Sequence, residues 1–182
     1  MKQIIAVISG IFLIASLSYA STPEELSKSY FDFMKEDQWD KLVELYDPSA
    51  LRDMREMLSF FSEVPDEMAP QMLAQFFGPG MTKATLKTMS DTDFFSSFFK
   101  GVMAQAEQLG QLEFKQVDIL GTVPEGENLR HVLARTHAKL GDMTMETMEV
   151  VSFKKTEGGW KILMQGKIKG MAQQLKKMFS RG

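Results

Sequence analysis

The hydrophobic period changes once along this chain, close to Gly110, and this change constrains the fold more than any other feature. Before Gly110 the apolar residues recur every three to four positions, as on one face of a helix. After it they alternate with polar residues, as on one face of a strand. A run of helices followed by a run of strands is typical of the α+β class, in which helices cover one face of an antiparallel sheet.

Capping residues indicate where the helices begin. Thr22 and Glu25 have the spacing of a capping box around a proline, so a helix is predicted to begin at about residue 22. Asp47 stands directly before a proline, and we expect it to end one short helix and to cap the next, over about 49–61. Further helices are predicted up to about residue 110.

The clearest helix is predicted to begin at Ser90, with Asp93 three residues later, and to end at Gly110. Its helical spacing gives a wide apolar face that must be buried against another layer. The residues of this face are Phe94, Phe95, Phe98, Phe99, Val102, Met103 and Ala106.

An antiparallel meander of about four strands is predicted after Gly110, because turn sequences that contain glycine separate the alternating segments. In the second segment the even-numbered residues from Val132 to Leu140 are apolar or small, and we expect them to face the core. The predicted strands are Leu112 to Val123, Leu129 to Leu140, Met143 to Lys155, and Trp160 to about Ile168.

Residues 1–20 have the pattern of a cleaved secretory signal peptide. Lys2 is followed by an apolar stretch, and small residues at positions 18 and 20 predict cleavage after Ala20. The alternative is an uncleaved membrane anchor, but the apolar stretch is shorter than the ~20 residues that span a bilayer. We therefore predict an exported protein, periplasmic or secreted, in which residues 21–182 form a single domain.

The composition excludes several classes of site. The chain contains no cysteine, so a disulfide framework is impossible. A formal net charge of −3 gives no sign of nucleic-acid binding. Residues 21–182 contain no phosphate-binding loop, zinc-ligand spacing, nucleophile elbow or dinucleotide fingerprint. We expect no metal, no cofactor and no nucleic-acid partner.

Two segments resemble a known superfamily. Tyr30 to Ala50, with its Asp-Gln-Trp-Asp break and its Leu-Val-Glu-Leu-Tyr-Asp-Pro run, resembles the opening of the nuclear-transport-factor-2-like (NTF2-like) superfamily, and Glu157 to Ile162 resembles its close. The resemblance is to an exported bacterial type of unknown function. It implies a cone, in which a curved antiparallel sheet wraps around helices and encloses an apolar pocket. No residue matches the catalytic acid of the ketosteroid isomerases in this superfamily, so none is assigned.

The two histidines, His131 and His137, lie on one face of the second predicted strand. Six residues of extended chain separate them by ~20 Å, so they cannot share a metal ion. Either one could serve as a general base beside a carboxylate from elsewhere in the chain. Solvent-facing histidines on a strand are the favoured interpretation.

An apolar pocket is suggested by the many methionine and phenylalanine residues, 15 and 14 in the whole chain. Flexible methionine and broad phenylalanine side chains can shape a pocket for an apolar ligand, although ordinary core packing explains the same helical spacing and is favoured. The candidate pocket residues are Met72, Phe76, Phe95, Phe98, Phe99, Met103 and Trp160.

The end of the chain is basic and amphipathic. Residues 161–182 include six lysine or arginine residues and no acid, and a short helix is predicted over about 170–180. We favour a helix that docks on the domain over one that touches anionic lipid. The apolar residues of this helix are Met171, Leu175, Met178 and Phe179.

These observations predict a non-enzymatic exported domain that binds an apolar small molecule or a protein partner. The first alternative is a small enzyme of isomerase or hydrolase type in the same fold, which would need a positioned acid or base in the concavity of the sheet. The second is an envelope protein that touches a membrane through its basic C-terminus.

Overall fold

The computed structural model describes residues 21–109, 112–164 and 166–179. Its element order confirms the predicted α+β class, with helices first and an antiparallel sheet after them. The helices are α1 (Pro23–Lys35), α2 (Trp39–Glu44), α3 (Pro48–Met57), α4 (Ala69–Phe77), α5 (Lys83–Thr88), α6 (Asp91–Leu109) and α7 (Gly166–Phe179), with a 3-10 helix at Ser59–Ser62. The strands are β1 (Leu112–Glu125), β2 (Leu129–Leu140), β3 (Met143–Thr156) and β4 (Gly159–Ile162).

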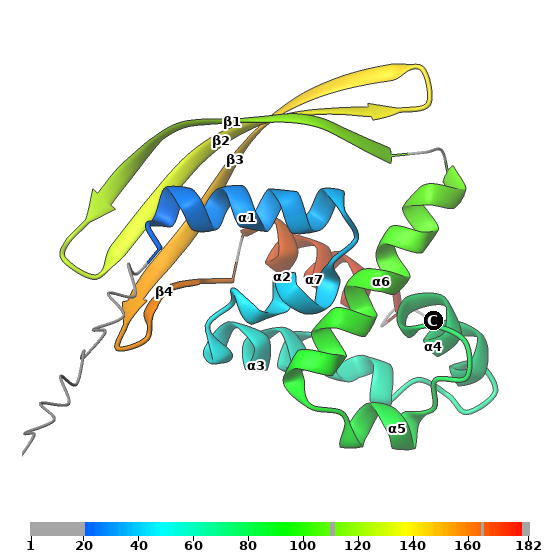
Figure 1. Ribbon diagram of the computed structural model, residues 1–182. Coiled ribbons are helices and arrows are strands. Elements are labelled where there is room, and N and C mark those ends of the chain that lie inside the picture. The colour runs from blue at the N-terminus through cyan, green and yellow to red at the C-terminus, as the bar shows by residue number, and fades with distance from the viewer. Residues whose placement is uncertain (1–20, 110–111, 165, 180–182) are drawn as a thin grey trace, which may run out of the picture.

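The four strands form one antiparallel sheet in the order β1-β2-β3-β4. The long strands β1, β2 and β3 bend over the helices, which lie on one side of the sheet (Figure 1). Two shifts of register in β1, near Lys115 and Leu120, are irregularities of the kind that increase the bend and twist of a strand. The α1 helix crosses β1 and β2 directly below this curved sheet.

The predicted helix starts are confirmed by hydrogen bonds. The Thr22 side chain accepts a bond from the Glu25 N–H, and the Thr22 N–H donates to the Glu25 carboxylate, which is the predicted capping box. Asp47 caps α3 by accepting from the Ser49 N–H. The Ser90 hydroxyl accepts from the Asp93 N–H at the start of α6.

The core lies between the helices and the inner face of the sheet, as the alternation predicts. Val132, Ala134, Thr136 and Ala138 of β2 are buried, whereas the described odd-numbered residues between them are more exposed. On the helical side many phenylalanine rings meet edge to face or in stacks. Together these two apolar surfaces form one contiguous buried cluster.

Three predicted boundaries are wrong. The fourth strand ends at Ile162 and not near Ile168, because the Ile162 N–H donates to Leu45 O and Ile162 O accepts from the Asp47 N–H. These bonds tie the end of the strand to the α2–α3 connection. The last helix begins at Gly166 and not near residue 170. The helix predicted over 49–61 is also divided, since α3 ends at Met57 and a 3-10 helix follows.

The α7 helix packs against α3. Ile168 is buried in the core cluster and Leu175 packs against it, while Lys176 and Lys177 are exposed. Among the described residues, no helix combines the length and the apolar character needed to cross a bilayer.

Several predictions fall outside the described part of the chain. They concern the signal peptide at 1–20, the helix end at Gly110 and the side chain of Leu140. The side chains of Met171, Met178 and Phe179 also lie outside it.

Candidate functional site

Six of the seven predicted pocket residues lie together in the helical layer, where they pack against one another or against the same core. Phe95 and Phe98 are fully buried, Met72 and Phe76 are almost so, and Phe99 and Met103 are partly buried. Phe76 stacks on Phe98 with ring centroids 6.3 Å apart, and Phe95 stacks on Phe99 with ring centroids 4.7 Å apart. Trp160 lies on β4 instead, beneath the Arg130 guanidinium. That these side chains line a pocket stays a prediction.

A cavity of about 830 Å³ lies elsewhere, between α4 and α6. It is half-open to solvent, and none of the seven predicted residues lines it. We call it the α4–α6 groove. Its lining residues are Gln71, Ala74, Gln75, Phe77, Gly78, Pro79, Ser97, Lys100, Gly101, Ala104 and Gln105.

Small residues create the groove. At Gly101 the α6 backbone lies against α4 so closely that a Cβ atom there would be 2.1 Å from the Phe76 carbonyl oxygen. Only glycine permits this approach, because every other side chain would push the two helices apart. On either side of the contact, Ala74, Gly78 and Ala104 leave space that larger side chains would occupy.

The polar groups of the groove are held in place by pairs of hydrogen bonds. The Gln75 amide donates to Gln105 Oε1 at 2.9 Å, and the Gln105 amide donates to the Gln75 carbonyl at 2.9 Å. Lys100 donates to both oxygens of Asp40, at 3.0 and 3.2 Å. Hydrogen bonds from Ser96 and then Lys100 lower the pKa of Asp40, so this carboxylate stays ionised at neutral pH and fixes the ammonium group.

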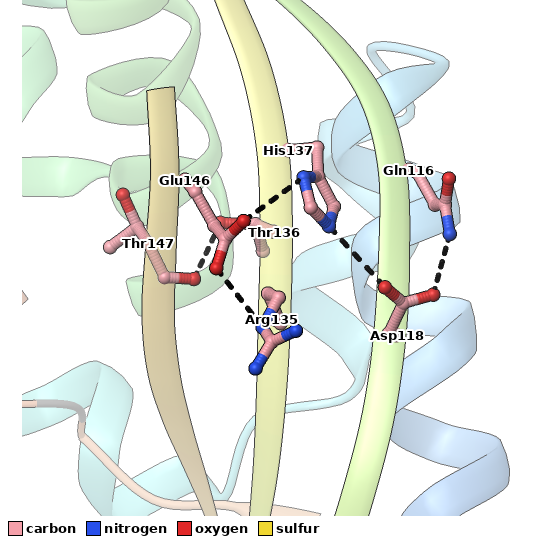
Figure 2. Close-up of polar contacts among 7 residues, drawn as sticks. All are labelled: Gln116, Asp118, Arg135, Thr136, His137, Glu146 and Thr147. Atoms are coloured by element: carbon pink, nitrogen blue, oxygen red, sulfur yellow. Dashed lines mark hydrogen bonds and ion pairs between the residues drawn. The ribbon is translucent and has the colours of Figure 1, made fainter. Parts of the chain in front are cut away.

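A second polar cluster lies on the outer face of the sheet and is centred on His137 (Figure 2). His137 Nε2 lies 3.3 Å from Asp118 on β1, and Nδ1 lies 3.7 Å from Glu146 on β3. Arg135 pairs with Glu146 at 3.2 Å. Hydrogen bonds from Gln116 first and His137 second lower the pKa of Asp118. These side chains are 30–56% exposed, as expected for a solvated charge network.

His131 lies in a similar arrangement between a carboxylate and a hydroxyl. Its Nε2 is 2.7 Å from Glu125 on β1, and its Nδ1 is 2.8 Å from Ser152 Oγ on β3. A hydroxyl, an imidazole and a carboxylate in a row have the connectivity of hydrolase triads. The α4–α6 groove does not reach this face, and we assign the arrangement no catalytic role.

Inside the cone, two tyrosines and an acid approach one another. Burial first, and then the neighbouring Tyr30 and Glu149, raise the pKa of Tyr46 well above its ordinary value, so the phenol stays protonated. These groups would suit acid–base chemistry, but none of them lines the α4–α6 groove.

Sequence reasoning missed the groove and the partners of both histidines. The Gly-Pro-Gly run after α4 and Gly101 inside α6 were the available signals for a close helix contact. Glu125 and Ser152 gave no signal, because only the register of β1, β2 and β3 brings them to His131. The described residues contain no group of three or more side chains that could hold a metal ion.

Comparisons with known proteins add a likeness in fold. No family model matches the chain, and no curated protein matches it. A crystal structure described as an NTF2-like transpeptidase from Campylobacter jejuni is similar, with 14% sequence identity, a TM-score of 0.35, and coverage of 80% of this chain and 100% of that one. A likeness of this size carries no argument about family or activity.

Proposed function

We propose that this chain is an exported, non-catalytic binding domain whose α4–α6 groove holds a small amphipathic molecule. One observation carries the proposal: a cavity of about 830 Å³ lies within the size range of ligand sites, roughly 300–1,000 Å³. Export is supported by the signal-peptide pattern of residues 1–20.

The lining of the groove defines the chemistry of its ligand. Phe77, Pro79 and the small residues provide an apolar surface for a hydrocarbon or aromatic part. The Gln71 amide and the paired Gln75 and Gln105 amides offer donors and acceptors. Lys100, whose ammonium group is held by Asp40, adds a charged N–H donor at one wall, so a ligand with an acidic or hydroxyl group beside its apolar part fits best.

The proposal is tested by filling the groove without disturbing the core. Ala104→Leu places a larger side chain into the lining, whereas Ala84→Leu makes the same change on the exposed surface of α5. Native mass spectrometry of protein purified from its own compartment should show a bound small molecule in the wild type and in Ala84→Leu, and its loss in Ala104→Leu. The intact mass also decides whether cleavage follows Ala20.

An added probe makes the test independent of the natural ligand. The dye 1-anilinonaphthalene-8-sulfonate combines an aromatic body with an anionic group, which matches the Phe77 surface and Lys100. We expect saturable binding that weakens at least tenfold in Ala104→Leu and stays unchanged in Ala84→Leu. Equal dye affinity in all three proteins, together with no retained molecule, would exclude the groove as a binding site.

A further inference from the structure

A smaller cavity, of about 250 Å³, lies between α1 and β1. In Figure 1 the α1 helix runs directly beneath the sheet at this place. We call the cavity the α1–β1 cleft. It opens to solvent and shares no lining residue with the α4–α6 groove. Its lining residues are Lys28, Phe31, Asp32, Lys35, Phe114, Lys115, Gln116 and Val117.

One wall of the cleft is a single face of α1. Its four residues stand at positions i, i+3, i+4 and i+7, which follow one another along the same side of a helix. Phe31 is buried, whereas Lys28 and Lys35 are exposed. Seven residues of helix separate the two lysines by about 10 Å, so one stands at each end of the wall.

The other wall is shaped by an irregularity in β1. Lys115 has no partner on β2, because the register shifts at this residue. In a regular strand, residues three apart point to opposite faces, and an inserted residue changes this alternation. Phe114 pairs with the buried Ala138. Val117 pairs with the buried Thr136. Both side chains therefore lie on the face of the sheet that α1 covers.

The middle of the cleft is apolar as a result, since Phe31, Phe114 and Val117 all contribute to its lining. Apolar lining of this kind favours a ring or a short hydrocarbon chain. A cavity of about 150 Å³ is large enough for benzene. The α1–β1 cleft therefore has room for one ring with a small substituent, and for little more.

The charges around this apolar centre favour an anion. Lys28 and Lys35 form no ion pair with any residue of the described chain. Lys115 pairs with Glu113, which balances its charge. Asp32 is the single acid of the lining and stands between the two unpaired lysines along α1. Two unpaired ammonium groups and one carboxylate leave an excess of positive charge at the cleft.

An organic anion satisfies both parts of the cleft together. Its apolar body would cover the phenylalanine rings, and its acidic group would accept charge-assisted hydrogen bonds from Lys28 and Lys35, whose flexible stems can reach a common point. We propose that the α1–β1 cleft binds a small organic anion that carries one acidic group on a single ring or a short hydrocarbon chain. An inorganic anion would leave the apolar surface uncovered, and a neutral molecule would leave both lysines unpaired.

The test compares three probes: benzoate has a ring and a negative charge, benzamide has the ring alone, and inorganic phosphate has the charge alone. Binding is followed through the backbone amide chemical shifts of the purified protein. We expect benzoate to shift the amides of residues 28–35 and 114–117 in a saturable manner. It should bind about tenfold more tightly than either benzamide or phosphate, because only benzoate uses both parts of the cleft.

Variants of the charged residues locate the site. Lys28→Gln and Lys35→Gln together should weaken benzoate binding about tenfold, whereas Asp32→Asn should strengthen it about twofold by removing a repulsive charge. Lys87→Gln, on the exposed surface of α5, is the matched control and should bind benzoate as the wild type does. All of these variants should keep the urea midpoint and the dye affinity of the α4–α6 groove.

Three results would overturn the proposal. The first is the absence of saturable benzoate binding, or equal affinity for benzoate and either of the other probes. The second is unchanged benzoate affinity in the double lysine variant and in Asp32→Asn. The third is benzoate binding that shifts residues 71–79 and 97–105 and is lost in Ala104→Leu, since the anion would then occupy the α4–α6 groove. Loss of groove binding alone leaves the α1–β1 cleft intact, so the two sites are tested separately.

Discussion

The helical layer and the outer face of β3 both carry large apolar residues, but only the helical layer buries them. In that layer Phe61, Phe77 and Phe98 meet with ring centroids 5.1 to 6.3 Å apart, and Phe98 is fully buried. On the outer face of β3 Met148 and Val150 remain about half exposed, whereas their neighbour Val151 on the inner face is fully buried. The apolar pattern therefore indicates a face, but it does not tell whether anything covers that face.

The sharpest test of this contrast compares one residue from each region. Phe98→Ala should lower the free energy of unfolding by about 3–5 kcal/mol, the usual cost of removing a buried phenylalanine ring. Met148→Ala, on the exposed outer face of β3, should change it by no more than about 0.5 kcal/mol. Urea unfolding of both variants gives the comparison directly. Similar losses in the two variants would mean that the outer face of β3 is covered.

The position of α7 gives a second, smaller test. Truncation after Lys169 removes the part of the helix that carries Leu175, which packs against the core cluster. We expect a loss of about 1–2 kcal/mol, since Leu175 is only partly buried. Binding to anionic vesicles should not change, as measured by sedimentation with the vesicles. Salt-sensitive vesicle binding that disappears on truncation would assign the helix to a membrane instead.

Much of the fold could be predicted because it depends on local signals. The change of period near Gly110 separates helices from strands, and Thr22, Asp47 and Ser90 cap helices through residues two or three positions away. The end of β4 could not be predicted, because it is set by bonds between Ile162 and a segment more than a hundred residues earlier.

The candidate site was harder to predict for the same reason. Helical spacing placed Phe95 and Phe98 on one face of a helix. Their burial depends on which other segments pack against that face, and the spacing does not show this. The α4–α6 groove depends on one close backbone contact at Gly101. The length of β3 that β4 leaves unpaired depends on where β4 ends. Each of these features is a property of two segments that meet, so neither segment shows it alone.

A further predicted loss of stability lies at Asp47, where the helical layer joins the sheet. Its N–H donates to Ile162 O of β4, and its carboxylate accepts from Ser49 at the start of α3. Asp47→Ala should lower the free energy of unfolding by about 1 kcal/mol, the typical cost of losing an N-cap. Asp47→Asn should cost less at neutral pH, because asparagine caps helices equally well.

The charge of Asp47 adds a dependence on pH whose sign can be stated. The hydrogen bond from the Ser49 hydroxyl, helped by the Ser49 N–H and opposed by burial, lowers the pKa of Asp47 in the folded state. The unfolded chain therefore takes up the proton first, near a pKa of about 3.9. The stabilisation is complete above that pH and is lost as the pH falls through the lower pKa of the folded state. Urea midpoints of the wild type and Asp47→Asn should therefore converge between pH 5 and pH 2 if the wild type is the more stable at pH 7. A difference between them that stays constant over this range would show that the ionised carboxylate contributes nothing at the junction of helices and sheet.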